Sequence, residues 1–245
     1  MTPEGCTEQV VAHVRTLIER RALRPGDRLP PERDLASQIG VSRPTVRAGL
    51  HALAAMGVVQ ARRGSGTFIP EGPPALGSEP LGFLAALHGF SRDEMYEARR
   101  VLEIGAAGLA AERATAEQLA ALADEVASLF ALMHEPQAFL VHDVNFHRGV
   151  AASSGNPILA ALIEMVSALY YERRRRTAER AVQRDRRAAA EAHRRIYQAI
   201  RGRDADGARR AMHDHLVEAS RFQAEEGDAE AVREPARRRR RRVAQ

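Results

Sequence analysis

Two stretches near the N-terminus decide the fold of the first part of the chain. Residues 25–36 read PGDRLPPERDLA, and residues 41–47 read VSRPTVR. The first stretch has proline and acidic residues where a helix begins, and that helix ends at Gly40. In the second stretch, Ser42 is placed to cap another helix, whose first turn tolerates a proline. Two short helices separated by a glycine–valine turn predict a helix-turn-helix.

The second helix of this pair carries candidate DNA-contacting side chains. Its apolar residues recur at i, i+4 and i+7, which predicts a buried inner face. Arg43, Thr45 and Arg47 then point outward from the end that enters the major groove in such motifs. An arginine there can bind guanine through two hydrogen bonds or hold a phosphate. Taken singly, each of these residues is equally compatible with a solvated helix face.

A predicted β-hairpin follows. Residues 58–61 and 67–69 flank a basic, glycine-rich segment with the sequence RRGSG. An amphipathic helix over residues 8–22 precedes the helix-turn-helix. A helix-turn-helix followed by a hairpin with a basic tip predicts a winged helix.

These segments together resemble the DNA-binding domain of GntR-type bacterial transcription regulators. The resemblance implies a double-stranded DNA operator as partner. It places operator contacts at Arg33, Ser42, Arg43, Thr45, Arg47, Arg63 and Gly64. Gly49 stands where the family usually has alanine, which predicts some loss of helix stability without a change in base reading.

Charge is distributed unevenly along the 245 residues, whose formal net charge is +5. Residues 1–70 carry +4, residues 71–232 carry −5, and residues 233–245 carry +6. A basic first segment beside an acidic body predicts that only the former meets a polyanion. We expect residues 226–245 to form a disordered arginine-rich tail, which can add salt-sensitive DNA affinity.

Composition excludes several other classes of protein. The chain is 44% hydrophobic and 28% charged, which is typical of a globular protein. It has neither an apolar run long enough to cross a bilayer nor a signal peptide, so we expect a cytoplasmic protein without a membrane partner. The single Cys6 excludes an internal disulfide and a cysteine-based zinc site, so histidines and carboxylates would have to hold any metal.

Proline and glycine indicate the domain boundaries. They concentrate in residues 71–80, which we interpret as a linker after a DNA-binding domain at residues 1–70. Residues 81–225 are rich in Ala, Leu, Glu and Arg with helical periodicity, which predicts an antiparallel bundle of about six or seven helices. The expected fold class is therefore mainly α: an N-terminal winged helix-turn-helix and a C-terminal all-α antiparallel bundle.

Four polar residues of the predicted bundle form a candidate metal site. Asp143 and His147 are i, i+4 and share one helix face, and two further helices each offer one histidine, His193 and His215. Together they could supply one oxygen and three nitrogens to a divalent transition metal with positions left open for a small molecule. Spacing alone also allows ordinary surface or core residues.

The pattern DVNFH, GNP, EAHRRI and a final HL resembles the FadR C-terminal domain of the FadR-like subgroup of these regulators. The resemblance implies an effector-binding and dimerisation domain that holds a divalent transition metal through Asp143, His147, His193 and His215. Zinc is the first expectation for this metal, and nickel or another ion is the alternative. His142 and His213 face elsewhere on their helices. Arg99 matches a position that can point into the effector cavity and suits a carboxylate. The alternative is a surface arginine at position 99 or 100 paired with Glu103.

The leading hypothesis is a ligand-responsive, homodimeric DNA-binding regulator. We expect a repressor that a small carboxylate effector releases from its operator. The alternative is a metal-dependent enzyme acting on a small organic acid, but the sequence lacks the His-Glu-x-x-His, Gly-x-Ser-x-Gly and Walker patterns. A helical scaffold without an effector is a third possibility, and it would leave the inward polar residues unexplained.

Overall fold

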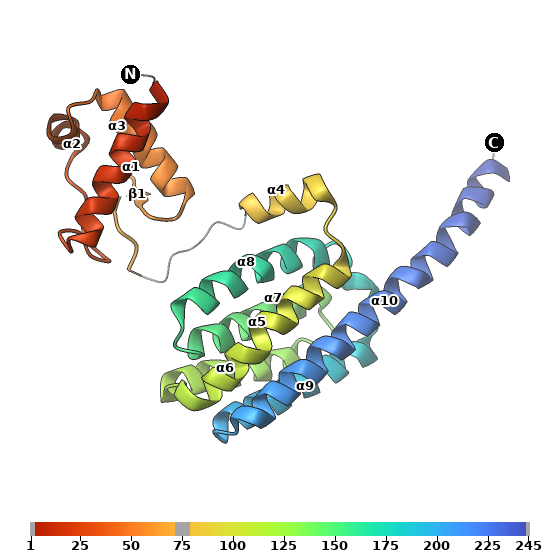
Figure 1. Cartoon of the computed structure of the whole chain (residues 1–245). Coiled ribbons are helices and arrows are strands. Elements are labelled where there is room, and N and C mark those ends of the chain that lie inside the picture. The colour runs from red at the N-terminus through yellow and green to blue at the C-terminus, as the bar shows by residue number, and fades with distance from the viewer. Residues whose placement is uncertain (1–2, 72–78, 244–245) are drawn as a thin grey trace. The chain divides into compact units, whose positions relative to one another are not determined.

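The computed structural model describes residues 3–71 and 79–243 (Figure 1). The chain divides into two compact units, residues 1–77 and 78–245. Of the expected linker, residues 72–78 lie outside the described part. The described residues form ten α-helices, one short 3₁₀ helix and one two-stranded sheet, so the expected fold class is confirmed.

Three helices build the first unit: α1 (Pro3–Glu19), α2 (Glu32–Ile39) and α3 (Arg43–Ala55). The expected helix covered residues 8–22, and α1 begins earlier than that, at Pro3. It also ends earlier, because the chain turns at Arg21, which has a left-handed φ of 58°. α2 ends on Gly40 in the left-handed conformation that favours glycine. Apolar faces of all three helices meet in one core, which contains Val10, Val14, Leu35, Val46, Leu50 and Leu53.

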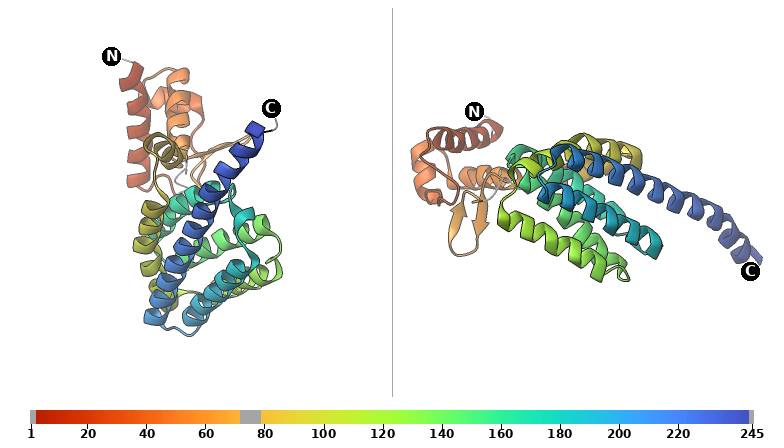
Figure 2. Two further views of the ribbon diagram at one scale, coloured as in Figure 1. Left: turned by 90° about the vertical axis from the view of Figure 1, so that its right-hand side faces the viewer. Right: turned by 90° about the horizontal axis from the view of Figure 1, so that it is seen from below.

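The wing is a short antiparallel hairpin of β1 (Gln60–Arg62) and β2 (Gly66–Phe68), visible in the right view of Figure 2. Gln60 pairs with Phe68, and the chain turns through Gly64, whose φ is +75°. On the other side, Arg28 forms an isolated antiparallel bridge with Phe68. The preceding loop thus fixes the base of the hairpin to the helices.

The second unit is a helical bundle. Its elements are α4 (Glu79–His88), α5 (Arg92–Arg113), α6 (Ala116–Ala131), α7 (Pro136–Ser153), α8 (Pro157–Arg174), η1 (Ala178–Arg180), α9 (Gln183–Arg201) and α10 (Ala205–Val243). Capping residues set several helix starts: Ser91 and Glu94 form a capping box on α5, and Asn156 accepts backbone N–H groups of α8. α5 packs against α7, α8, α9 and α10, which makes it the central helix (Figures 1 and 2).

The last helix differs from the expectation of a disordered tail over residues 226–245. The backbone of α10 continues to Val243, and residues 244–245 lie outside the described part. Ala, Glu and Arg favour helix, and a helix already formed by its bundle turns needs no new nucleation. Among the described residues, no helix is both long enough and apolar enough to cross a membrane.

Candidate functional site

The predicted DNA contacts lie around the start of α3 and on the wing. Arg43 is exposed in the first turn of α3. Ser42 is the N-cap of this helix: its Oγ accepts the backbone N–H of Thr45 at 3.3 Å and lies 2.8 Å from the Thr45 hydroxyl. The cap fixes the end of the helix that carries the outward side chains.

Arg47, one turn further along α3, is held by α2. Its Nε and Nη2 donate to the two carboxylate oxygens of Glu32 at 3.2 and 2.9 Å. This ion pair also lowers the pKa of Glu32, through the hydrogen bond from Arg47. A two-pronged bond of this kind orients a guanidinium while leaving it accessible, and the Arg47 side chain remains 58% exposed.

The other predicted contacts are exposed as well. Arg33 lies on the outer face of α2 with 85% of its side chain exposed. Arg63 and Gly64 form the exposed tip of the wing. Arg62 is held differently, since its guanidinium lies 4.6 Å from the centre of the Phe68 ring. The wing therefore presents Arg63, while Arg62 packs along the hairpin.

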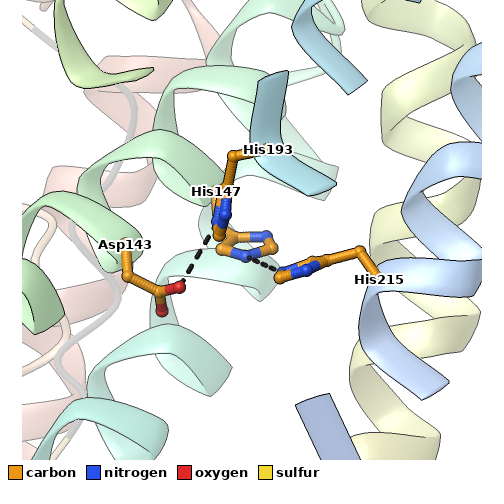
Figure 3. Close-up of side chains that lie close together, drawn as sticks. All are labelled: Asp143, His147, His193 and His215. Atoms are coloured by element: carbon orange, nitrogen blue, oxygen red, sulfur yellow. Dashed lines mark hydrogen bonds and ion pairs between the residues drawn. The ribbon is translucent and has the colours of Figure 1, made fainter. Parts of the chain in front are cut away.

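The four candidate metal ligands come together inside the bundle (Figure 3). α7 supplies Asp143 and His147, α9 supplies His193, and α10 supplies His215; all four are buried. One potential ligand atom from each residue lies within 4.8 Å of the other three. His142 and His213 take no part: the first pairs with Glu125 at 2.7 Å, and the second is exposed beside Asp214.

Hydrogen bonds orient the imidazoles toward the middle of the cluster. His193 Nδ1 donates to the carbonyl of Ala189 at 2.7 Å, which leaves the lone pair on Nε2. His193 Nε2 lies 3.3 Å from Asp143 Oδ1, and His147 Nε2 lies 3.2 Å from His215 Nε2. His193 Nε2 and Asp143 Oδ2 are buried without a hydrogen-bond partner. Unsatisfied buried atoms of this kind point to a missing partner in the middle.

Glu103 on α5 is a site residue that the sequence analysis placed only in the alternative interpretation of Arg99. It is buried, and its Oε2 lies 2.5 Å from His147 Nδ1. Its other oxygen accepts Arg99 Nε at 2.7 Å. The expected Arg99–Glu103 pair therefore exists, but it lies in the interior, since 2% of the Arg99 side chain is exposed. A carboxylate on the outer nitrogen of a metal-binding histidine commonly orients that ring.

Burial and neighbouring charges set the protonation of the cluster. Burial lowers the pKa of His193 to about 4, although Asp143 acts in the opposite direction. Burial also lowers the pKa of His215, assisted by His193 and His147. Burial alone would raise the pKa of Glu103, but Arg99 and His147 bring it down to about 2. Neutral imidazoles and ionised carboxylates are the states that bind metal ions.

A cavity of about 70 Å³ lies beside the cluster. Its wall includes the cluster residues Asp143 and His215, three arginines (Arg99, Arg174 and Arg186), and apolar side chains such as Phe139 and Phe222. A water needs only about 10–15 Å³ on such a measure, so a larger polar group fits here. Arg99 lines this wall, and its Nη1 is buried without a hydrogen-bond partner. The cavity thus joins the cluster to an unused arginine donor.

The cluster fits a first-row transition metal better than a hard cation. Three imidazoles and one carboxylate are the donors that zinc, nickel and similar ions prefer, whereas magnesium and calcium prefer oxygen alone. Two of the buried atoms without a hydrogen-bond partner, His193 Nε2 and Asp143 Oδ2, belong to this donor set. The residues present therefore fit such an ion.

A winged helix-turn-helix together with a helical bundle that holds a buried polar cluster beside a cavity defines a DNA-binding transcription regulator with a second functional domain. Comparisons with known proteins agree. Residues 6–69 match the bacterial regulatory proteins of the gntR family, and residues 94–218 match the FCD domain. The chain belongs to the GntR family, in its FCD-containing form, and is a transcription regulator rather than an enzyme.

Its relatives carry names of the same kind. The HTH-type transcriptional regulator LutR of Bacillus subtilis is 33% identical over 208 residues, which cover 82% of this chain and 93% of LutR. The HTH-type transcriptional repressor NanR of Klebsiella aerogenes is 32% identical over 220 residues, 87% of this chain and 84% of NanR. The solved structure of Streptococcus agalactiae GntR aligns with a TM-score of 0.68 and 30% identity, over 88% of this chain and 99% of that chain.

Proposed function

We propose that this protein is a homodimeric repressor that a small carboxylate releases from its operator, with a divalent transition metal, zinc foremost, in the effector site. The observation that carries the proposal is the buried cluster of Asp143, His147, His193 and His215 with unpartnered atoms beside a cavity. A metal bound there would supply a positive charge to which a carboxylate oxygen binds.

Arg99 supports a carboxylate as effector. Its guanidinium lies over two aromatic rings, 4.3 Å from the centre of Tyr170 and 5.5 Å from that of Tyr96, and its Nη1 is buried without a hydrogen-bond partner. A guanidinium held in this way is preorganised to bind a carboxylate. One relative, from Escherichia coli and 33% identical, is named a putative L-lactate dehydrogenase operon regulatory protein, which suits a small acid.

We assign DNA binding to residues 1–70 and effector binding and dimerisation to residues 81–225. The proposed operator contacts are Arg33, Ser42, Arg43, Thr45, Arg47, Arg63 and Gly64. Operators read by helix-turn-helix dimers consist of two half-sites related by a two-fold axis, which supports a homodimer. NanR, the repressor among the relatives, supports repression as the mode of action.

The test is a gel shift with the DNA upstream of the protein's own gene. Protein loaded with zinc is titrated with acetate, lactate, succinate and citrate, and the same titration is run on His147→Ala. The exposed His213→Ala serves as the matched control. We expect at least one acid to release the DNA from wild type and His213→Ala but not from His147→Ala. Release that persists in His147→Ala, or no release by any acid, contradicts the proposal.

A further inference from the structure

Glu103 stands between the candidate metal cluster and the cavity. Its two carboxylate oxygens contact different partners: Oε1 accepts Arg99 Nε at 2.7 Å, and Oε2 lies 2.5 Å from His147 Nδ1. About 3% of its side chain is exposed, so water screens neither contact. Arg99 in turn borders the cavity, and His147 belongs to the cluster. Glu103 thus forms ion pairs with a residue of the cavity wall and with a residue of the cluster.

We propose that Glu103 is a positioning residue that makes anion binding at Arg99 conditional on a metal at the cluster. It does so in two ways, by orienting His147 for the metal and by neutralising Arg99 while the metal is absent. The inference rests on the proposed function, and it adds an order of binding to it: the cation first, the acid second.

Glu103 acts on the metal site through His147. A carboxylate on Nδ1 favours the tautomer that leaves the Nε2 lone pair of His147 directed into the cluster, toward His215. The Arg99 guanidinium lines the same cavity as Asp143 and His215, so its positive charge acts against a cation at the cluster. Without Glu103, this repulsion would be uncompensated in a dry interior.

Glu103 acts on anion binding through Arg99. While Glu103 is bound to Arg99, the guanidinium is already partnered by a negative charge, so an incoming carboxylate gains less from it. A metal ion at the cluster restores the net positive charge of the site. The rings of Tyr96 and Tyr170 hold Arg99 independently of Glu103, so removal of the carboxylate leaves a positioned, unneutralised cation.

Glu103→Gln is therefore expected to change the two affinities in opposite directions. Zinc affinity falls by about 10–100-fold, the usual effect of losing the partner of a ligating histidine. Acetate binding to the metal-free protein becomes stronger than in wild type. Loss of fold or packing would instead weaken both.

The experiment uses the full-length protein and two probes, Zn²⁺ and acetate. Zinc affinity is measured by competition with a chromophoric chelator. Acetate affinity is measured from the rise in melting temperature, with and without zinc. Glu97→Gln removes the same charge from an exposed position of α5 and is the matched control. We expect zinc to strengthen acetate binding markedly in wild type and in Glu97→Gln, and much less in Glu103→Gln.

Glu103→Asp separates the orientation of His147 from the neutralisation of Arg99. It also replaces Glu103→Gln in the experiment if that variant does not fold. It keeps the negative charge but is too short to reach both partners, so zinc affinity should fall while metal-free acetate binding stays weak. The inference is overturned if Glu103→Gln shifts both affinities in the same direction, or neither. Failure of wild type to bind zinc or acetate at all would instead contradict the proposed function.

Discussion

At the scale of single residues, the buried imidazoles make the metal-free protein sensitive to acid. The pKa of His193 is about 4 in the folded protein and about 6.5 in the unfolded chain, so the unfolded chain binds more protons between these values. The contribution of His193 to the free energy of unfolding should therefore be complete above about pH 6.5 and be lost as the pH drops toward 4. The loss from this one group is on the order of 3 kcal/mol. Urea unfolding with a chelator present measures it.

The variants His193→Gln and His213→Gln locate this effect. His193→Gln removes the buried imidazole and should flatten the stability curve between about pH 6.5 and 4. His213→Gln removes an exposed one and should leave the curve as in wild type. If the His193→Gln and wild-type curves run parallel over this window, the acid sensitivity belongs to other groups.

A second prediction at this scale concerns the metal as a link between helices. The four proposed ligands come from α7, α9 and α10, so a bound ion would join three helices directly. We expect zinc to raise the stability of wild type by about 3 kcal/mol at a hundredfold excess over its Kd. His147→Ala and His193→Ala should neither bind the metal nor be stabilised by added zinc, whatever the stability of each variant without metal. Elemental analysis and melting curves with and without zinc decide the matter.

These residues show what a sequence can reveal about a site. The four proposed ligands were identified through their spacing and a family resemblance, because the i, i+4 pair of Asp143 and His147 and the motifs around His193 and His215 can be read directly from the sequence. Glu103 was assigned no site role, since an i, i+4 arginine–glutamate pair reads the same on a surface and in a core. Its burial depends on the packing of α5 against α7 and α10, which only the folded chain defines.

At the scale of elements, the contact between α1 and α3 depends on a glycine. A Cβ at Gly49 would lie 2.5 Å from Val10 Cβ, closer than two carbons can approach. Gly49→Ala should therefore destabilise the first unit by about 1–3 kcal/mol, the usual cost of overpacking, despite the better helix propensity of alanine. Thermal or urea unfolding measures this.

Two controls test the cause. Gly105 lies in α5, and a Cβ added there would have no neighbouring atom within 4 Å, so Gly105→Ala should stabilise the protein by up to about 1 kcal/mol. The double variant Val10→Gly/Gly49→Ala, which removes the Val10 Cβ, should be more stable than the sum of the two single changes predicts. Strict additivity would show that the two side chains do not compete for the same space.

The recognition helix gives the next prediction. Arg43→Ala should lose about 1–3 kcal/mol of operator affinity and relax base selectivity, because it removes an exposed side chain from the capped start of α3. Arg47→Ala should act similarly, and Glu32→Gln more mildly, since Glu32 orients Arg47. Arg100→Ala, which removes the same charge from the helical unit, is the control. Gel shifts in which Arg43→Ala and Arg47→Ala match this control would contradict the assignment.

The sequence predicted elements better than their ends. Periodic apolar residues identified the helices of both units, and Ser42 and the glycine-rich hairpin tip identified the start of α3 and the wing. The predicted end of α1 was wrong because the turn that follows the helix contains a left-handed Arg21, a conformation that arginine does not signal. The backbone of α10 continues past the expected end of the bundle at residue 225, since low apolar content does not prevent an existing helix from continuing.

At the scale of the whole molecule, positive charge belongs to the two ends of the chain. The first 70 residues carry +4 and the last 13 carry +6, whereas the segment between them is acidic. The arginines at 237–242 can neutralise DNA phosphates and release counterions, which is a contribution without sequence information. They should therefore strengthen binding to operator and random DNA alike.

Deletion of residues 233–245 tests this division of labour. We expect affinity for all DNA to fall by the same factor, and the slope of log affinity against log salt to become shallower by up to about 5 for six arginines. Replacing Arg237–Arg242 with lysine keeps the charge and should keep the wild-type slope, whereas glutamine at the same positions should behave like the deletion. Binding is measured on operator and scrambled duplexes over a range of salt. A deletion that lowers operator affinity more than scrambled affinity would mean that the tail contacts bases, because counterion release alone cannot distinguish the two duplexes.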